Sequence, residues 1–294
     1  MTEHKSGFVA IVGRPNVGKS TLMNSLIGQK IAITSPVAQT TRNRLKGILT
    51  LPHAQIIFVD TPGIHKPHHL LGEVLVKNAV SAIKSVDLVL WLVDGSVDLG
   101  KGDQFIAELL IKSKQPVIVG INKIDLGQDG IVSYQEFSQQ YNWETLCFSA
   151  ITGAGLMALP TKIVEKLPCG PQYYPPDLVT DQPERFIMAE LIREQILHLT
   201  REEVPHSVAV IIERVIEEPD ITKVYACICV ERMSQKGILI GKNGSMLKQI
   251  GTLAREQIQK LITGKVYLGL FVKVEPKWRS SRFQLSELGY TLED

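Results

Sequence analysis

Short hydrophobic runs alternate with helical patterns over the first 167 residues of the chain. Each run is hydrophobic at nearly every position, which is typical of strands that are buried on both faces of a sheet. The runs are GFVAIVG (7–13), AQIIFVD (54–60), DLVLWLVD (87–94), PVIVGINK (116–123) and ETLCFSA (144–150). Helical patterns cover residues 18–28, 71–86, 102–113 and 155–167. This alternation predicts an α/β domain with a doubly wound, mostly parallel sheet, which binds ligands at the carboxyl ends of its strands.

The pattern changes after residue 167. Residues 168–180, PCGPQYYPPDLVT, hold four prolines and no lysine or arginine, and they predict a stiff linker. We expect the next helix to have Asp181 as its N-cap, with Glu184 three residues on, and to end near Glu203. Further patterns predict strands at 206–215, 221–232 and 266–276, a long helix at 245–262 and a helical tail at 279–289. The sequence therefore predicts domains at 1–167 and 181–294, the second in α-β-β-α-α-β order.

The composition narrows the class of protein. A chain of 294 residues with 44% hydrophobic residues can build two domains of ordinary size, and its net charge of +2 points to no particular partner. No run approaches 18 apolar residues, and the N-terminus lacks the form of a signal peptide. Four cysteines in so long a chain do not make a disulfide framework, so we expect a reducing, cytoplasmic location.

The stretch GRPNVGKS (13–20) has the form of a phosphate-binding loop between a strand and a helix. Gly13 and Gly18 allow the backbone to turn its N–H groups toward phosphates, and Lys19 adds a positive charge for the β- and γ-phosphates. The hydroxyl of Ser20 is suited to Mg²⁺. The expected nucleotide-binding residues of this loop are Gly13, Arg14, Pro15, Asn16, Val17, Gly18, Lys19, Ser20 and Thr21.

The base of the nucleotide is read by later motifs. NKID (122–125) ends the fourth run, and Asp125 can accept hydrogen bonds from the N1–H and the exocyclic amine of guanine, which adenine does not offer as a pair. Asn122 and Lys123 are expected to brace the loop and cover the base. SAITG (149–153) follows the next run, so Ser149 and the N–H of Ala150 are expected beside the guanine O6. The alternative is that NKID is an ordinary turn at the end of a strand.

Two further loops predict a nucleotide-dependent switch. DTPG (60–63) ends the second run, so Asp60 is expected to hold Mg²⁺ through water and the Gly63 N–H to contact the γ-phosphate. QTTR (39–42) lies upstream, where Thr41, or alternatively Thr40, can bring a hydroxyl to the same ion. Loops of this kind are ordered by γ-phosphate and Mg²⁺ and are released after hydrolysis. Lys19, Thr41 and Gly63 are the expected catalytic residues.

These motifs, in this order, resemble the translation-factor-related small GTPases, and GRPNVGKS, QTTR, DTPG and NKID closely resemble the Era family. The resemblance covers about residues 7–167 and implies a Mg²⁺-dependent hydrolysis of GTP to GDP. Ras-like enzymes place a glutamine after the DTPG glycine to orient water, but this chain has Ile64, so we expect slow intrinsic hydrolysis. The resemblance also makes Asn16 a candidate ligand for K⁺; its other reading is a side chain that braces the loop.

Charge is unevenly distributed in the second half. Residues 232–282 hold 11 Lys and Arg against 2 Asp and Glu, whereas residues 181–231 hold 5 against 11. The basic segment contains GKNG (241–244), a G-x-x-G turn between two helices, and this combination predicts a type II KH domain that clamps single-stranded RNA. The expected RNA-binding residues are Ile240, Gly241, Lys242, Asn243, Gly244 and Lys248, with Ile238, Met246 and Ile250 as further groove residues.

A phosphate-loop GTPase joined to a type II KH domain extends the resemblance to the Era family over nearly the whole chain. The resemblance implies binding to the 3′ region of 16S-type rRNA, assistance in assembly of the small ribosomal subunit, a monomer, and peripheral association with the inner face of the cell membrane. Because Ile64 replaces the glutamine, an RNA-binding protein with a GTP sensor of negligible turnover is the alternative. A GTPase of tRNA modification is less favoured, because the chain lacks the added helical domain and the cysteine-ended tail.

Three other features have competing readings. HKPHH (65–69) suggests a metal site but fits a solvated loop better. Cys227 and Cys229 lie on one face of a predicted strand, which favours packing in a core. Trp278 lies in the basic segment and is able either to stack on a base or to pack inside the domain.

Overall fold

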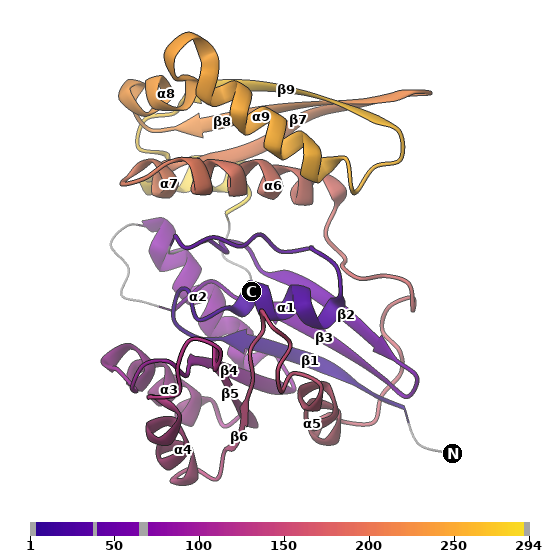
Figure 1. Ribbon diagram of the computed structural model, residues 1–294, viewed down its shortest axis with the longest axis vertical. Helices are drawn as coiled ribbons and strands as arrows, with labels where there is room; N and C mark the ends of the chain where they lie inside the picture. Colours follow the sequence, from indigo (N-terminus) through magenta and orange to yellow (C-terminus); the bar gives the residue numbers. More distant parts are fainter. Residues whose placement is uncertain (1–3, 38–39, 65–69, 291–294) are drawn as a thin grey trace.

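Two β-sheets, one above the other in Figure 1, organise the computed structural model of the protein. The structure describes residues 4–37, 40–64 and 70–290. The larger sheet has six strands in the order β2-β3-β1-β4-β5-β6, and the smaller sheet has three in the order β7-β8-β9. The expected α/β arrangement followed by an α+β arrangement is confirmed. The boundaries 1–167, 168–180 and 181–294 remain our proposal for the domains.

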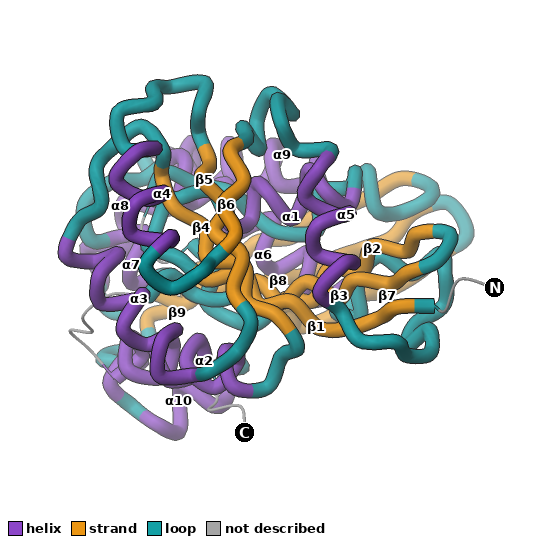
Figure 2. Tube along the Cα trace, turned by 90° about the horizontal axis from the view of Figure 1, so that it is seen from below, coloured by secondary structure: helices purple, strands orange, loops and turns teal. Residues whose placement is uncertain are grey.

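The larger sheet and its helices are built from β1 (Lys5–Val12), α1 (Lys19–Ile27), β2 (Leu45–Leu51), β3 (Ala54–Asp60), α2 (Leu70–Lys84), β4 (Leu88–Asp94), α3 (Lys101–Ser113), β5 (Val117–Asn122), α4 (Ile131–Gln139), β6 (Glu144–Cys147) and α5 (Ala158–Lys166). Its neighbouring strands are parallel except for β2, which pairs antiparallel with β3. Figure 2 shows α1 and α5 on one side of this sheet and α2 and α3 on the other. All five predicted strands and all four predicted helices are present.

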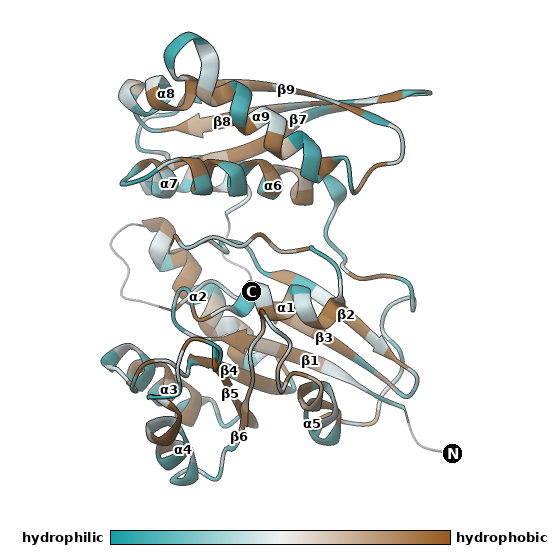
Figure 3. Cartoon of the chain, in the orientation of Figure 1, coloured by the Kyte–Doolittle hydropathy of each residue, from teal (hydrophilic) through white to brown (hydrophobic). Residues whose placement is uncertain are grey.

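The strand β2 and the helix α4 were not predicted. The sequence of β2, LKGILTL, mixes a lysine, a glycine and a threonine with its hydrophobic residues, because a strand at the edge of the sheet is less buried than a central one. The helix α4 buries only Tyr134 and Ser138, so its hydrophobic periodicity is weak. Figure 3 shows that hydrophobic residues instead follow the central strands of the larger sheet, where burial is complete on both faces.

The smaller sheet and its helices are built from α6 (Glu184–Leu199), α7 (Val204–Ser207), β7 (Ala209–Glu218), β8 (Ile221–Val230), α8 (Met233–Ile240), η1 (Lys242–Gly244), α9 (Ser245–Ile258), β9 (Lys265–Val274), η2 (Trp278–Ser280) and α10 (Arg282–Glu287). The strand β8 pairs antiparallel with β7 and parallel with β9. The predicted α-β-β-α-α-β order is therefore confirmed, with α7 added after α6. The helices α6 and α9 pack on one face of the sheet through Ile192, Ile196, Ala254 and Ile258.

The expected N-cap at Asp181 is wrong. The helix α6 is preceded directly by Pro183, whose fixed φ of −58° suits the start of a helix. The Asp181 carboxylate instead accepts hydrogen bonds from Lys46 at 2.7 Å and from the Tyr174 hydroxyl at 3.1 Å. The helix also ends at Leu199 rather than near Glu203, and the short α7 begins at Val204.

The predicted linker 168–180 runs from the start of β1 past β3 to the edge strand β2. The buried amide of Gln55 accepts hydrogen bonds from the N–H groups of Tyr173 and Tyr174, at 2.9 and 3.0 Å. The N–H of Ile48 in β2 donates to the carbonyl of Val179 at 2.8 Å. The segment is therefore bound to the first domain along its length, which limits how the second domain can move.

Candidate functional site: a nucleotide pocket tied to the second domain

The GRPNVGKS loop joins β1 to α1 in a backbone conformation that its glycines permit. Gly18 has a φ of 100°, and a Cβ there would lie 2.5 Å from the Asn122 side chain. A Cβ on Gly13 would lie 2.3 Å from the Leu92 carbonyl oxygen. Both glycines are therefore required, and α1 begins directly at Lys19 with its free N–H groups toward the loop.

Lys19 is held inside the loop. Its Nζ donates to the carbonyl oxygens of Gly13 at 3.3 Å and Arg14 at 2.9 Å, and only 6% of the residue is exposed. Burial lowers the pKa of Lys19 to about 8, and the nearby Asp60 carboxylate acts in the opposite direction. A lysine buried in this way binds an anion strongly, because little water competes for its charge.

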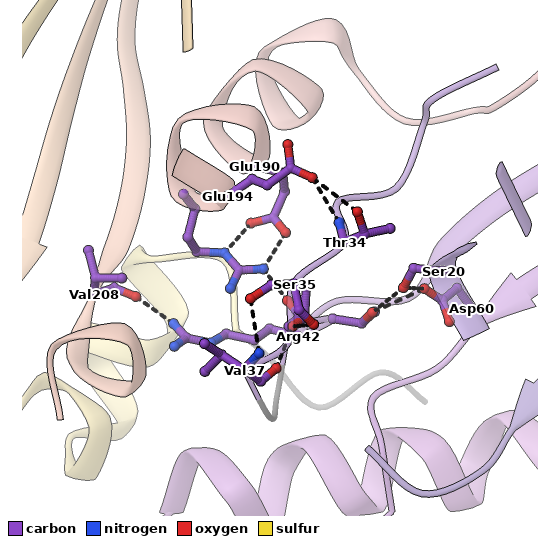
Figure 4. Close-up of polar contacts among 12 residues, drawn as sticks. Ser20, Thr34, Ser35, Val37, Arg42, Asp60, Glu190, Glu194 and Val208 are labelled. Atoms are coloured by element: carbon purple, nitrogen blue, oxygen red, sulfur yellow. Dashed lines mark hydrogen bonds and ion pairs between the residues drawn. The ribbon is translucent and has the colours of Figure 1, made fainter. Parts of the chain in front are cut away.

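Ser20 and Asp60 face each other (Figure 4), and Thr41 lies within hydrogen-bond distance of both, so the three residues predicted for a Mg²⁺ site are together. Asp60 Oδ2 accepts hydrogen bonds from Ser20 at 2.7 Å and Thr41 at 3.0 Å, and the two hydroxyls lie 2.9 Å apart. Asp60 Oδ1 is buried without a hydrogen-bond partner, and burial raises the pKa of this carboxyl. Two hydroxyls and a carboxylate with an orphaned oxygen fit a hard divalent cation. Thr40, the alternative to Thr41, donates to the Val37 carbonyl at 2.6 Å instead.

Four of the five predicted base-reading residues, Asn122, Lys123, Asp125 and Ser149, line one cavity of about 310 Å³. Asn122 connects the phosphate loop to the SAITG turn, because its Nδ2 donates to the Val17 carbonyl and its Oδ1 accepts the Ala150 N–H, both at 2.9 Å. Lys123 has a φ of 66° and forms an ion pair with Asp94 at 2.7 Å. The cavity is lined by Asn16, Gly18, Thr21, Ser35, Pro36, Asn122, Lys123, Asp125, Ser149 and Ile151.

Ala150 departs from its expected role. Its N–H already donates to Asn122 Oδ1, and the residue is 3% exposed, so this N–H is not a free donor for a guanine O6. Ser149 Oγ accepts the N–H of Thr152 at 3.1 Å and so shapes the same turn. In this conformation the two residues support the wall of the cavity.

Gly63, Ile64 and Asn16 lie beside the phosphate loop. A Cβ on Gly63 would lie 2.8 Å from the Pro15 nitrogen, so only glycine allows this close approach. Ile64 is 2% exposed and packs in the hydrophobic core, so its side chain is unable to orient a water molecule. Asn16 Nδ2 donates to the Pro36 carbonyl at 2.8 Å, which is the bracing role.

Arg14 has a buried partner that sequence reasoning missed. Its Nε donates to Asp103 Oδ1 at 2.8 Å, and the Asp103 side chain is fully buried at the start of α3. The Tyr134 hydroxyl of α4 donates to Asp103 Oδ2 at 3.0 Å, and burial raises the pKa of that tyrosine. Arg14 therefore anchors the loop to α3 rather than pointing at the nucleotide cavity. Val17 is buried in the hydrophobic core.

The segment that carries Thr41 is bound on its other side by the second domain (Figure 4). Arg42 is 2% exposed and donates to the carbonyls of Val208, Pro205 and His206 at 2.5, 3.1 and 3.2 Å. Its guanidinium also lies 5.9 Å from the ring centroids of Trp278 and Tyr290. The sequence around Arg42 does not indicate this role, because the carbonyls that it contacts lie about 165 residues further along the chain.

The helix α6 holds the same segment through three side chains. Fully buried Arg193 donates to the Thr40 carbonyl, and Glu194 accepts the Thr34 N–H at 2.9 Å and pairs with Lys30 at 2.5 Å. His198 Nε2 lies 3.0 Å from the Thr34 carbonyl. Residues on both sides of Thr41 are therefore fixed to the second domain.

The GKNG turn has the geometry expected of a G-x-x-G loop. Gly241, Asn243 and Gly244 have φ values of 71°, 53° and 76°, and Lys242 and Asn243 are exposed. An adjoining groove of about 490 Å³ runs between α9 and β9. Lys248 lines it, together with two residues that the sequence did not indicate, Arg255 and Tyr267. Its lining is Gly244, Leu247, Lys248, Gly251, Thr252, Arg255, Tyr267, Leu268 and Leu270.

Some expected groove residues have other positions. Ile250 is fully buried in the core, so its expected place in the groove is wrong, whereas Ile238 is exposed. Ile240 and Met246 are half-buried beside the turn. Trp278 does not stack on a base: it is fully buried, and its Nε1 donates to the Ser207 carbonyl at 2.9 Å.

Two remaining features are simpler. Cys227 and Cys229 are each 3% exposed in the core, as predicted. HKPHH (65–69) lies outside the described residues. Over residues 4–37, 40–64 and 70–290, no helix has the length and hydrophobicity to cross a bilayer.

Comparison with known proteins adds to this geometry. A family model described as 50S ribosome-binding GTPase matches residues 8–123, and one described as KH domain matches residues 203–279. A GTPase Era of Nostoc sp. (strain PCC 7120) is 71% identical over 296 residues, which cover 99% of this chain and 91% of the relative. A GTPase Era of Crocosphaera subtropica is 66% identical and covers 99% of this chain and 94% of the relative.

Solved structures agree with these relatives. Era in complex with MgGDPNP and nucleotides 1506–1542 of 16S ribosomal RNA superposes with a TM-score of 0.94, at 40% identity over 98% of this chain and 100% of that chain. A variant of Aquifex aeolicus Era bound to GDP and AlF4⁻ gives the same TM-score, identity and coverage. Near-full-length identity, the order of the GTPase motifs and the KH fold together place this chain in the Era family of GTPases.

Proposed function

We propose that the protein hydrolyses GTP, binds the single-stranded 3′ region of 16S-type rRNA and assists assembly of the small ribosomal subunit. One observation carries the proposal: the residues of the predicted Mg²⁺ site and the residues that fix the KH domain are neighbours in one segment, Thr40–Thr41–Arg42. A segment shared in this way lets nucleotide state and RNA affinity influence each other.

The nucleotide site is suited to GTP. Lys19 and the N–H groups of the loop bind the phosphates, and Asp125 selects guanine. Ser20, Thr41 and Asp60 would hold Mg²⁺, which when bound neutralises charge on the phosphates. Because Ile64 is buried in the core, no side chain at that position orients the attacking water, so turnover without a partner is slow.

The RNA assignment rests on the GKNG turn and its groove. The related Era was solved with a 16S rRNA segment, and this chain shares its fold at a TM-score of 0.94. Exposed Lys242 and Asn243, with Lys248 and Arg255 along the groove, provide cationic and polar groups for an RNA backbone. A monomeric, cytoplasmic protein with peripheral attachment to the inner face of the membrane, and a K⁺ ion at Asn16, belong to this proposal as predictions from family resemblance.

A charge-reversed turn tests the RNA role. We expect Lys242→Asp combined with Asn243→Asp to weaken binding of a 16S-type 3′-end oligonucleotide by about tenfold or more, because carboxylates would face the phosphates. GTP affinity should not change, since both residues lie on the second domain. Fluorescence anisotropy gives the RNA affinity, and GTP turnover with and without RNA, in K⁺ and in Na⁺ buffer, gives the coupling.

Exposed residues elsewhere on the second domain provide the matched control. Lys260→Asp combined with Thr263→Asp should leave RNA binding close to the unmodified protein, because both residues are exposed and lie beyond the groove lining. Unchanged RNA affinity in the Lys242 and Asn243 variant would remove the KH assignment. RNA binding without any effect of RNA or K⁺ on turnover would favour the GTP-sensor alternative.

Arg42→Ala tests the link between the domains. The substitution leaves the carbonyls of Pro205 and Val208 without their donor, whereas that of His206 keeps Arg279 at 3.5 Å, so we expect a loss of about 1–3 kcal/mol in the free energy of unfolding. We also expect RNA to lose its effect on GTP turnover. Arg42→Lys should recover only part of both, because a lysine lacks the planar fork. Chemical denaturation and turnover assays measure the two effects.

Arg185→Ala is the control for Arg42, since Arg185 is an exposed arginine at the start of α6. Full RNA stimulation in Arg42→Ala, together with unchanged stability, would show that the buried arginine does not couple the domains.

A further inference from the structure

The helices α6 and α9 cover one face of the smaller sheet and leave the opposite face to other contacts. Along β8, Val224, Ala226 and Ile228 point into the hydrophobic core with α6 and α9. Side chains alternate along a strand, so Lys223, Tyr225 and the buried Cys227 point to the opposite face. The register of β8 with β9 places Tyr267, Gly269 and Phe271 beside these three residues, on that same face.

Only one half of this face is covered. Cys227 and Cys229 lie under Trp278, Leu285 and Tyr290 of the C-terminal segment and beside Leu71 and Leu75 of α2. Along the edge strand β9 the side chains are open: Tyr267 is 48% exposed, Phe271 is 59% exposed, and Tyr225 of β8 is half-buried between them. Exposed aromatic residues grouped on one face of a sheet are unusual for a surface that contacts only water.

The open half has the arrangement of a stacking surface. The rings of Tyr225 and Tyr267 lie 5.9 Å apart, and the Arg214 guanidinium of β7 lies 4.8 Å over the Tyr225 ring. Lys236 Nζ lies 5.4 Å over Phe271. Tyr267 and Phe271 are four positions apart, or about 13 Å along the strand, and the residue midway between them, Gly269, has no side chain of its own.

Gly269 lets the rings of Tyr225 and Tyr267 lie against the strand. A Cβ at this position would lie 3.0 Å from Cδ1 of Tyr225 and 3.4 Å from Cε1 of Tyr267. The two tyrosine rings thus meet over a bare stretch of backbone, with cations at two of the rings. Aromatic rings and guanidinium planes are the groups on which unpaired bases stack.

We propose that this face, formed by Arg214, Tyr225, Tyr267 and Phe271, is a second binding site for single-stranded RNA. It extends the site at the GKNG turn, so the inference rests on the proposed RNA-binding function. Continuity supports RNA as the occupant: Tyr267 lines the groove beside α9 and also contacts Tyr225, so a strand that leaves the groove over β9 reaches the aromatic rings directly.

Charge on this face favours phosphate near the rings. Lys223 and Lys273 are already paired with Glu218 and Glu275, at 2.6 and 2.5 Å, so they add little net charge. The cations that remain at the rings are Arg214 and Lys236. A face with aromatic rings and a few cations suits base stacking with weak phosphate contacts, in which sequence preference is low.

The test compares a short and a long RNA on the full-length protein. The short probe is a 16S-type 3′-end oligonucleotide of about five nucleotides, enough for a groove that clamps about four. The long probe extends it to about 12 nucleotides. We expect Tyr225→Ala and Phe271→Ala to bind the short probe normally and the long probe about tenfold more weakly. Tyr225→Phe and Phe271→Tyr keep their rings and should bind both probes normally.

A second readout reports stacking itself. With 2-aminopurine placed in the extension of the long probe, its fluorescence should be quenched on binding to the unmodified protein and to the ring-keeping variants, and less so with either alanine variant. The proposal fails if the unmodified protein binds both probes equally, or if the alanine variants bind the long probe normally. It also fails if they bind RNA normally but no longer sediment with small ribosomal subunits, which would indicate a protein partner. Failure of the unmodified protein to bind the short probe would instead overturn the proposed RNA function.

Discussion

Lys19→Ala is expected to lower GTP turnover by about a hundred- to a thousandfold. The Lys19 ammonium lies inside the GRPNVGKS loop, where it now donates to the carbonyls of Gly13 and Arg14. A γ-phosphate in the loop offers a better acceptor than a carbonyl, and the charge is shielded from water. Alanine removes the cationic side chain of the loop that would neutralise developing negative charge, since the other cation, Arg14, is paired with Asp103. Turnover is measured with Lys112→Ala as the control, an exposed lysine on α3.

The same lysine should make nucleotide binding depend on pH. In the protein without nucleotide its pKa is lowered to about 8, so the charged form predominates below this pH. Phosphates favour the charged form, so binding raises the pKa, and affinity is greatest below about pH 8. We expect the GTP dissociation constant to rise by up to about tenfold per pH unit above that. Lys19→Arg stays charged and should show a flat profile.

Normal turnover in Lys19→Ala would mean that GRPNVGKS is not the phosphate site. A flat pH profile in the unmodified protein would mean that the buried lysine stays charged through this range, and the assignment would then rest on the substitution alone.

The first domain was predictable because its signals are local. Five strands read as hydrophobic runs, since both faces of a central parallel strand are buried. The elements that escaped, β2 and α4, lie at the edge of the sheet or bury few residues. The wrong prediction of an N-cap at Asp181 also arises from a non-local contact. Its carboxylate accepts a hydrogen bond from Lys46, about 135 residues away, which a short sequence pattern does not contain.

In the candidate nucleotide site, too, residues that belong to motifs were predictable, whereas their distant partners were not. Ser20, Thr41 and Asp60 come from three separate motifs, yet each motif indicates its own residue, so their meeting point was predictable. The partners of Arg14 and Arg42 were not. Asp103 and the carbonyls of Pro205 and Val208 belong to no motif, and a backbone carbonyl leaves no trace in a sequence.

Arg42 connects the predicted Mg²⁺ site of the first domain to the KH domain. Thr41 faces the predicted Mg²⁺ site, and the next residue enters a cage of carbonyls and aromatic rings on the KH domain. The helix α2, which follows the DTPG loop, also packs against that domain through Leu71 and Leu75. Both loops that are expected to sense the γ-phosphate thus lead directly into contacts with the RNA-binding half.

Asp125→Asn is expected to change the preferred base. Asp125 is exposed at the mouth of the 310 Å³ cavity, where its carboxylate can accept both the N1–H and the exocyclic amine of guanine. An asparagine keeps one acceptor and adds a donor, which suits the C2 carbonyl of xanthine instead. A site built on paired hydrogen bonds discriminates strongly, so we expect the preference for GTP over xanthosine triphosphate to fall by about a thousandfold or more.

Competition binding with GDP and xanthosine diphosphate measures this change directly. Asp129→Asn is the matched control, because Asp129 is an exposed acid four residues further along that does not line the cavity. It should keep the preference for guanine. The Ala150 N–H also affects base selection. Because it donates a hydrogen bond to Asn122, it can contact the guanine O6 only if that bond is shared or broken when the nucleotide binds. An unchanged preference in Asp125→Asn would show that Asp125 does not select the base, and would favour the hydrogen-bonded Asn122 and Ala150 instead.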